Sequence, residues 1–437
     1  MSMLEMGYMS FPILLLMIFF RAPIGLAMFL CGIGGLYFSM GGANMFLAKL
    51  KSETYSTFSS YSLSIIPMFL LMGQFATLSG MSKALFKAAE SWLGHKRGGV
   101  AMAAVGACAG FGSICGSSLA TAATMSRVAL PELRRYGYSG GFATATLAAG
   151  GTLGILIPPS VILVIYAILT EQNIAKLFLA AFVPGLLAAL GYMLTISLYV
   201  RLNPNSAGTK ERLPYSARFA ALVDVWPVLL VFGLVVGGIY LGWFTPTEGA
   251  AVGAAGTGII AFLSGTLSWS VFKESIISTA KSTAMIFFIV LGAGFYNSFL
   301  ALTQVPQELS TYVVSQGFSP WLVLCLVLAF YLVFGCLMDS LSMILLTVPI
   351  FFPVISGLDF GMTPEQVAIW FGILVLIVVE VGLITPPVGM NLFIINAMDR
   401  TTPMSETYKA VLYFVGSDIL RVILLVLFPS ITLFLLR

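Results

Sequence analysis

The sequence predicts an all-α polytopic membrane protein, on three observations. Of its 437 residues 59% are hydrophobic and only 9% are charged, with 21 Lys and Arg against 17 Asp and Glu. A soluble domain has about 25% charged residues, so this chain lacks the polar groups that a soluble surface needs. The apolar residues are also grouped into stretches long enough to cross a bilayer. A cytosolic enzyme, a nucleic-acid-binding protein and a disordered scaffold are therefore excluded, and a lipid bilayer is the expected surrounding.

The sequence offers few residues for catalytic or redox chemistry. It contains one histidine, His95, and five cysteines, none of them in a CxxC pair. It contains no GxxxxGK[ST] phosphate loop, which excludes ATP hydrolysis by that route. We expect no enzyme, and we expect the energy for any transport to come from an ion gradient or from a partner.

Ten apolar stretches are interpreted as full membrane spans. The first has no early Lys or Arg and no small-residue cleavage site, so we expect a retained span rather than a signal peptide. The ten spans are residues 3–20, 22–40, 61–80, 140–168, 177–200, 225–243, 247–266, 283–301, 366–397 and 409–435.

Two further stretches, residues 100–131 and 320–356, predict re-entrant helical hairpins. Each is too long for one simple span and has a small, polar centre, which reads GFGSICGSSLAT in the first and FGCLMDSLS in the second. Such a centre is costly in contact with lipid but acceptable at a hairpin tip that is buried in protein.

The distribution of Lys and Arg supports the hairpins. If both stretches turn back and the N-terminus is periplasmic, 16 of the 21 positive residues fall on the cytoplasmic side and four on the outer side. If each stretch crosses once, the count becomes eight inside and 12 outside. The positive-inside rule favours the first arrangement, in which both termini are periplasmic.

The two halves of the chain show the same order of features, which predicts an inverted repeat. The matched positions Ser118 and Ser340 are 222 residues apart, and Pro158 and Pro386 are 228 apart. Five crossings per half is an odd number, so the halves have opposite orientations, as is typical of secondary transporters. The predicted parts are a first repeat at 1–201 with a broken helix at 140–168, a cytoplasmic linker at 202–218, and a second repeat at 219–437 with a broken helix at 366–397.

Two polar segments predict amphipathic arms that lie along the membrane surface. Within 81–97 the apolar residues recur at helical spacing, and Trp269, Phe272 and Ile276 make a similar stripe in the second half. A solvated loop with incidental spacing is the alternative for both segments.

Each hairpin tip, combined with the broken helix of its own half, predicts a cation site. In the first, the tip Gly112–Ser118 faces GGTLGILIPPS at 150–160, where prolines free backbone carbonyls from the helix. In the second, the tip Gly335–Ser340 faces EVGLITPPVGMN at 380–391, and Asp339 adds a negative charge. A carboxylate costs about 2.5–3.5 kcal/mol at the centre of a membrane helix, so a bound cation is the expected partner. Packing and kinking alone are the alternative roles for these glycines and prolines.

Other polar residues of the predicted core have open roles. Glu380 either tunes the second site or makes a hydrogen bond within the bundle, and Asp418 and Arg421 are expected to form a structural pair. No Lys or Arg lies near either tip, so an anionic substrate would be held by helix N-termini and by the bound cations. The candidate substrate-binding residues are Ser117, Thr121, Ser160 and Asn391.

The same motifs resemble a known family. The runs GACAGFGSICGSSLATAA, GGTLGILIPPSVILVIYAI, FGCLMDSLSMILLTVPIFFPV and GLITPPVGMNLF look like the large membrane subunit of a tripartite ATP-independent periplasmic (TRAP) transporter. The resemblance implies a sodium-coupled importer of the elevator type in a bacterial inner membrane. It also implies two partners, a small four-span membrane subunit on a separate chain and a periplasmic substrate-binding protein.

The resemblance also implies at least two Na⁺ ions and their sites. One departure from the family is Cys115, because many members have serine there and a thiol is a poor ligand for Na⁺. Residues of the first site are Cys115, Gly116, Ser117, Ser118, Gly154, Ile157 and Pro159. Residues of the second site are Gly335, Asp339, Ser340, Gly382, Thr385 and Pro387.

The function expected from the sequence is a sodium-coupled symporter subunit for a small organic anion, such as a carboxylate or sulfonate. Residues 83–200 and 273–409 are expected to contribute to a transport domain that slides against a scaffold. A stand-alone sodium–anion symporter without a binding protein is the first alternative, and a passive channel or an ABC-type permease is the second. The sequence does not name the substrate.

Overall fold

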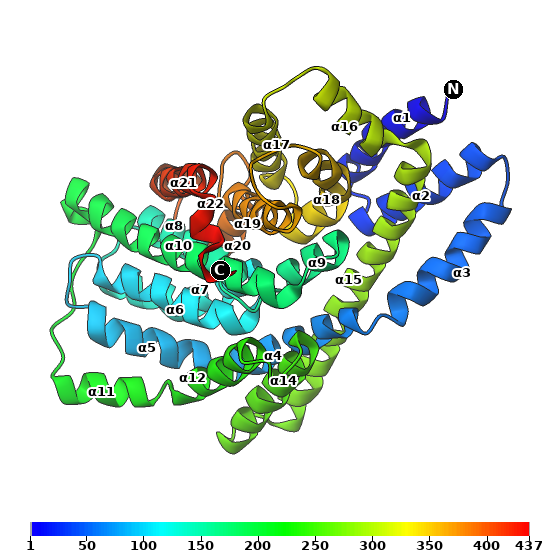
Figure 1. Cartoon of the computed structure of the whole chain (residues 1–437). Coiled ribbons are helices and arrows are strands. Elements are labelled where there is room, and N and C mark those ends of the chain that lie inside the picture. The colour runs from blue at the N-terminus through cyan, green and yellow to red at the C-terminus, as the bar shows by residue number, and fades with distance from the viewer. Residues whose placement is uncertain (1, 437) are drawn as a thin grey trace.

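The computed structural model describes residues 2–436 and is built from helices, with no β-strand in that range. Figure 1 shows the helices packed into one body, with the N-terminal helices along one flank and the C-terminus near the middle of the view. The prediction of an all-α fold is confirmed.

The first half of the chain begins with two apolar helices joined by a tight turn. It ends with the longest helix of this half, which has 29 residues. The elements are α1 (Met3–Phe19), α2 (Ile24–Met40), α3 (Asn44–Phe58), η1 (Ser62–Ser64), α4 (Ile65–Leu78), α5 (Met81–Leu93), α6 (Gly99–Cys115), α7 (Ser118–Arg135), α8 (Gly140–Leu156), α9 (Val161–Thr170) and α10 (Ile174–Leu202).

The second half follows a linker that contains one short turn of helix. It includes the longest helix of the structure, with 35 residues. The elements are η2 (Pro204–Ser206), α11 (Tyr215–Val223), α12 (Trp226–Phe232), η3 (Gly233–Gly237), α13 (Gly238–Tyr240), α14 (Pro246–Leu263), α15 (Trp269–Thr303), α16 (Val305–Ser315), α17 (Pro320–Gly335), α18 (Ser340–Ser356), α19 (Pro364–Gly382), α20 (Met390–Met398), α21 (Met404–Leu427), α22 (Pro429–Thr432) and η4 (Phe434–Leu436).

Each of the ten predicted spans contains helix in the structure, and that all ten cross a membrane remains a prediction. Four helices are long and apolar enough to cross a membrane alone, namely α10, α15, α19 and α21. The number rises to seven if each bent pair is one span, and α8 with α9 is such a pair, bent by 45° at the Pro-Pro break. The apolar helices α1 and α2 have 17 residues each.

Both predicted hairpins form as pairs of packed helices. In the first, α6 and α7 are joined by Gly116 and Ser117, and Gly116 takes the left-handed conformation (φ 65°) that ends α6. In the second, α17 and α18 are joined by residues 336–339, and Asp339 caps α18. That these hairpins re-enter the membrane from opposite sides remains a prediction.

The arm segments differ from the sequence prediction in the second half. Residues 81–93 form the expected helix α5, which packs against α6. Trp269 and Phe272, however, lie in the first turns of α15, so they continue directly into a span. In the second half the third span is followed by α16, which therefore takes the place that α5 has in the first half. The sequence also missed α3, because its mixed polar composition hides a helix that meets α4 at a 55° bend.

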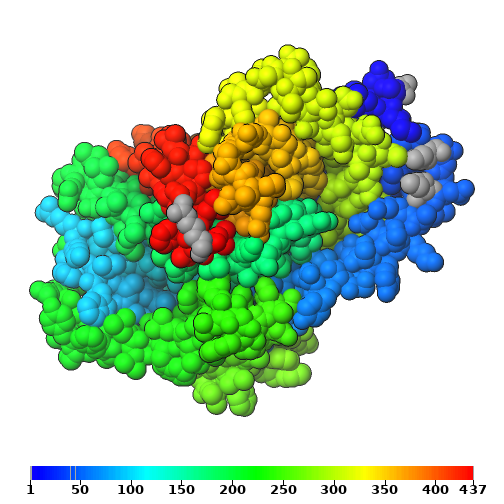
Figure 2. Space-filling view, viewed as in Figure 1, coloured from blue at the N-terminus to red at the C-terminus, as the bar shows by residue number. Residues whose placement is uncertain are grey.

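The helices pack in two groups. In the first group α15 lies against α2, α3 and α4, and α14 packs on α4. In the second group α8 packs against α6, α7, α10, α20 and α21, while α19 packs against α17 and α18. Figure 2 shows the blue N-terminal helices on the right flank and the orange and red segments of the second group near the middle of the view. Helix α15, which contains the predicted span 283–301, packs mainly against α2 and α4 and also touches α18.

The two broken helices lie at the centre of the second group. Every residue of α8 is buried, and so is α19 from Val367 onward. Helix α8 is rich in Gly, Ala and Thr, which lets neighbouring backbones approach closely. The break after α8 is therefore held inside protein and does not face lipid, whereas the break after α19 is partly exposed at Pro387.

A polar cluster ties the end of the first hairpin to the loop after α20. The guanidinium group of Arg134 donates hydrogen bonds to Asp399 and to Thr402, and both threonines of the loop, Thr401 and Thr402, donate to the Asp399 carboxylate at 2.6 Å. Burial alone raises the pKa of Asp399, but the hydrogen bonds from Thr401, Thr402 and Arg134 outweigh it and hold the pKa below its usual value.

Replacing Arg134 with glutamine will lower stability at neutral pH. The change removes the charged partner of Asp399, whose side chain is 7% exposed, and we expect a loss of about 1–3 kcal/mol. Because the pKa of Asp399 is depressed, its contribution is present above about pH 4 and is lost as the carboxylate is protonated. Thermal unfolding of both proteins at pH 7 and at more acidic pH will show the difference shrinking with acidification. A pH-independent difference would contradict this account.

Candidate functional site

Two pairs of glycines seat the hairpin tips against the broken helices. A Cβ atom placed on Gly112 would lie 2.4 Å from the Cα atom of Gly154, and one placed on Gly382 would lie 2.7 Å from the Cα atom of Gly335. No side chain fits at these contacts, so each tip touches the break of its own half directly. The structure therefore brings together the two pairs of segments that the sequence analysis matched.

The first candidate cation site lies where the tip after α6 meets the end of α8. A Cβ atom on Gly154 would lie 2.4 Å from Oγ1 of Thr121 and 2.9 Å from the carbonyl oxygen of Ser117. A Cβ atom on Gly116 would lie 3.4 Å from the carbonyl oxygen of Pro159. Pro158 and Pro159 have no N–H, so they leave carbonyls of the last turn of α8 without helical donors. Carbonyl and hydroxyl oxygens of this kind suit a hard monovalent cation.

The second candidate cation site contains a carboxylate. Asp339 is the N-cap of α18: its side chain accepts hydrogen bonds from the backbone N–H of Ser342 at 3.1 Å and from the Ser342 hydroxyl at 2.6 Å. Asp339 is partly exposed and makes no ion pair among the described residues. It thus combines a capping role with an uncompensated charge.

Backbone donors already use several carbonyls around the second break. Thr385 N–H donates to Gly382 at 3.0 Å, and Asn391 N–H donates to Leu383 at 3.1 Å. The Tyr408 hydroxyl donates to the carbonyl of Pro387 at 2.6 Å. Because these carbonyls have donors, Asp339 is the main oxygen ligand that the second candidate site could offer a cation.

The two tips meet at one cavity of about 180 Å³. The same cavity is lined by residues of α4 and α15, so it lies between the two groups of helices. Asp339 is its one charged lining residue in the range that the structure describes, and Lys and Arg are absent from the lining. The lining residues are Leu70, Gly116, Ser117, Ser118, Leu119, Ile155, Val161, Ile162, Ser282, Met285, Ile286, Asp339, Ser340, Leu341 and Leu383.

The first residues of α7 and α18, Ser118 and Ser340, both line this cavity. Two helix N-termini therefore meet at one place, and each carries a partial positive charge that favours an anion. The cavity thus combines features that attract an anion with one carboxylate that opposes it.

Of the four candidate substrate-binding residues, one lines the cavity. Ser117 does so, whereas Thr121, Ser160 and Asn391 are 0% exposed and lie outside the lining. The Ser160 hydroxyl accepts from the Leu163 N–H at 3.4 Å and so caps α9. The amide of Asn391 donates to the Ala148 carbonyl at 3.4 Å.

Sequence reasoning missed the contribution of the first helix group to the cavity. Leu70 from α4 and Ser282, Met285 and Ile286 from α15 carry no motif that would single them out. It also missed Tyr408, a lone aromatic residue 21 positions after Pro387. Glu380, whose role was left open, receives hydrogen bonds from serines at both tips.

Comparison with known proteins now decides the family. The family model described as "Tripartite ATP-independent periplasmic transporter, DctM component" matches residues 11–431 of the chain. The chain belongs to this family. It is therefore the large permease component of a TRAP transporter, a multi-pass membrane protein and not an enzyme.

Curated relatives cover most of this permease. It is 37% identical over 389 residues to the C4-dicarboxylate TRAP transporter large permease protein DctM of Pseudomonas aeruginosa, covering 88% of each chain. It is 32% identical over 435 residues to the protein of the same name from Vibrio cholerae, covering 93% of this chain and 92% of the relative. It is 29% identical over 434 residues to the sialic acid TRAP transporter permease protein SiaT of Haemophilus influenzae, covering 98% of this chain and 68% of the relative.

A solved structure shares the fold of the permease at low sequence identity. The crystal structure of the YdaH transporter of Alcanivorax borkumensis superposes with a TM-score of 0.68 and 13% identity. The match covers 89% of this chain and 90% of the other. This similarity supports the arrangement of helices and nothing finer.

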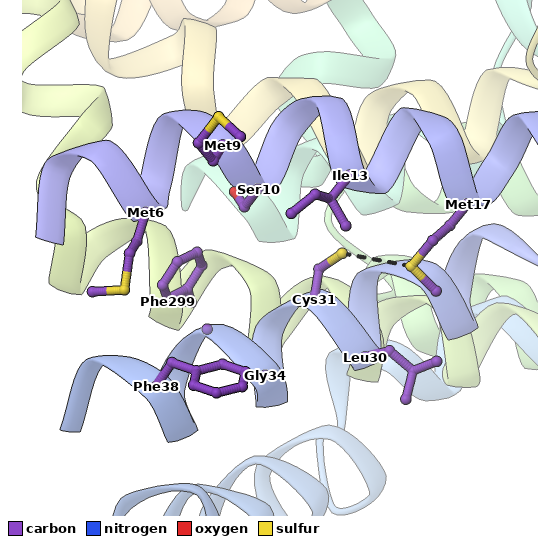
Figure 3. A pocket seen from close by; sticks show the side chains of 11 residues that line it. Met6, Met9, Ser10, Ile13, Met17, Leu30, Cys31, Gly34, Phe38 and Phe299 are labelled. Atoms are coloured by element: carbon purple, nitrogen blue, oxygen red, sulfur yellow. Dashed lines mark hydrogen bonds between the residues drawn. The ribbon is translucent and has the colours of Figure 1, made fainter. Parts of the chain in front are cut away.

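A larger cavity of the permease lies away from both tips. It measures about 580 Å³ and is lined by α1, α2 and Phe299 of α15. Figure 3 shows Met, Leu, Ile and Phe side chains facing it, with Cys31 next to Met17 and Ser10 as its one hydroxyl. Without charged or freed polar groups it is not a candidate for the ion site.

The predicted pair of Asp418 and Arg421 is confirmed as a structural contact. The Arg421 guanidinium lies 2.8 Å from the Asp418 carboxylate, and both side chains are buried. The Tyr192 hydroxyl donates to Asp418 at 2.8 Å and contacts the hydroxyl of Thr152 at 2.9 Å. This network joins α21 and α10 to α8 at Thr152, two residues before Gly154.

Replacing Gly154 with alanine will destabilise the first site. The added methyl group would clash with Thr121 and with the Ser117 carbonyl, and we expect a cost of about 1–3 kcal/mol. Gly416 of α21 is the matched control, because a Cβ atom there meets nothing within 4 Å. Alanine at 416 will leave stability equal or raise it by up to about 1 kcal/mol through helix propensity. Thermal unfolding of the two purified variants measures both changes in stability. Equal unfolding temperatures for the two variants would contradict the close contact of Gly154 with Thr121 and Ser117.

Proposed function

We propose that the permease is a sodium-coupled importer of a small organic anion that a periplasmic binding protein delivers. The observation that supports this best is the single cavity where both hairpin tips meet. It combines two helix N-termini with freed carbonyls, hydroxyl groups and one carboxylate, and it lies between two separately packed groups of helices.

The chemistry of the cavity supports coupling to Na⁺. Without a cation, Asp339 adds a negative charge to the lining and opposes an anionic substrate. Cations at the two breaks would reverse this balance, so that the helix N-termini could hold the anion. Binding of cation and anion would then be mutually dependent, which is the thermodynamic basis of symport.

The names of the relatives favour a C4-dicarboxylate as the substrate. Relatives at 37% and 32% identity are named C4-dicarboxylate permeases, whereas the relatives named for sialic acid and isethionate are 29% and 28% identical. A C4-dicarboxylate is therefore the first substrate to test.

The two helix groups support an elevator movement. The group around α8 and α19 carries both tips and both breaks, and it meets α4 and α15 of the other group across the cavity. In this proposal the second group, around α8 and α19, slides with its cargo along the first group. A small four-span membrane subunit would complete the fixed part.

Reconstitution into vesicles tests the proposal. The purified permease, with the proposed small membrane subunit, is placed in proteoliposomes with an inward Na⁺ gradient, and uptake of radiolabelled succinate is measured with and without the proposed binding protein. Uptake that needs both Na⁺ and the binding protein supports the proposal. Uptake without the binding protein favours a stand-alone symporter, and uptake that is insensitive to Na⁺ refutes sodium coupling.

Replacing Asp339 with asparagine will abolish sodium-dependent uptake without unfolding the protein. Asparagine caps a helix about as well as aspartate, so we expect stability within about 0.5 kcal/mol of wild type. Alanine at this position removes the cap as well and will cost about 1 kcal/mol more. Uptake assays and thermal unfolding separate the two effects, and wild-type sodium dependence in the asparagine variant would exclude Asp339 from the second site.

A further inference from the structure

Glu380 is a buried carboxylate that contacts both hairpin tips. It lies in the last turn of α19 and is 1% exposed. Its Oε1 atom accepts a hydrogen bond from the Ser340 hydroxyl at 2.5 Å and one from the Ser118 hydroxyl at 3.5 Å. One oxygen atom therefore connects the first residues of α7 and α18.

These two serines are the residues through which Glu380 reaches both candidate cation sites. Ser118 follows Ser117 at the first tip, and Ser340 follows Asp339 at the second. Both serines line the cavity, whereas Glu380 does not. Within residues 2–436 no other side chain is hydrogen-bonded to both tips.

Glu380 forms no ion pair within the described part of the chain, and its Oε2 atom is buried without a hydrogen-bond partner. A buried carboxylate without a compensating charge is unfavourable. A cation at either tip would offset this cost and strengthen the hydrogen bonds from both serines.

We propose that Glu380 is a positioning residue that couples the two candidate cation sites. A cation at one tip stabilises the carboxylate, the carboxylate fixes the serine of the other tip, and the second cation binds more tightly. This inference rests on the proposed sodium coupling. It adds that the two ions bind cooperatively and names the side chain responsible.

The test is a sodium titration of thermal unfolding with the purified permease. Na⁺ is exchanged for K⁺ at constant ionic strength, and stabilisation is fitted to a Hill equation. For wild type we expect a Hill coefficient between 1.5 and 2, roughly the value for two coupled sites. In E380Q the amide oxygen still accepts from the serines but the charge is gone, so the coefficient falls to about 1 and half-saturation needs about 10-fold more Na⁺.

A matched control separates coupling from general weakening of the bundle. T144V removes a buried hydrogen bond of 2.8 Å between Thr144 of α8 and Thr407 of α21, away from the tips. It will lower the unfolding temperature and leave the Hill coefficient unchanged. If E380Q does not fold, E380D serves instead, because its shorter side chain cannot reach both serines, and it too will lose cooperativity.

The outcomes distinguish this inference from the proposed function. Stabilisation of wild type by Na⁺ with an unchanged Hill coefficient in E380Q overturns the role of Glu380 and leaves sodium coupling intact. A Hill coefficient of 1 in the wild-type protein also overturns the coupling role of Glu380 and leaves sodium coupling intact. No difference between Na⁺ and K⁺ in wild type overturns sodium coupling and this inference together.

Discussion

Direct backbone contact at two pairs of glycines is the constraint on which the site depends. Gly112 meets Gly154, and Gly335 meets Gly382, each at a distance that excludes a side chain. These contacts hold the end of one hairpin helix beside the end of a broken helix, where backbone groups lack partners. Without them the freed carbonyls would lie apart from the serines of the tips. The small residues of α8 serve the same end, since they let α6, α7 and α21 pack closely around it.

Two carboxylates near the tips occupy different surroundings and have different consequences. Asp339 lines the cavity and caps a helix, so its charge acts on whatever enters. Glu380 is buried behind the tips and accepts hydrogen bonds from serines of both hairpins. In the proposed symport, Asp339 would face the cations directly and Glu380 would act through the serines of the two tips.

The sequence predicted the hairpins, the breaks and their pairing because each has a local signature. Small polar tips and Pro-Pro pairs stand out inside apolar runs, and their spacing repeats between Ser118 and Ser340. The sequence did not reveal that Ser117 and Ser160 cap helices. It also did not reveal that α4 and α15 form one wall of the cavity. Those features depend on side-chain orientation and on contacts across the fold, and apolar residues such as Leu70 and Met285 carry no signal of position. The grouping of α15 with α2 was missed for the same reason.

The length of α15 has a consequence for how the protein sits in a bilayer. Its 35 residues at about 1.5 Å each span roughly 50 Å, against about 30 Å for the hydrocarbon layer. A rod of this length must tilt or protrude, and Trp269 at its start is 78% exposed, as suits a residue at the lipid–water interface. Because α15 also lines the cavity, bilayer thickness and the geometry of the site are mechanically linked through one helix. A thinner or thicker membrane would change the tilt of α15 and, with it, the cavity wall that α15 forms.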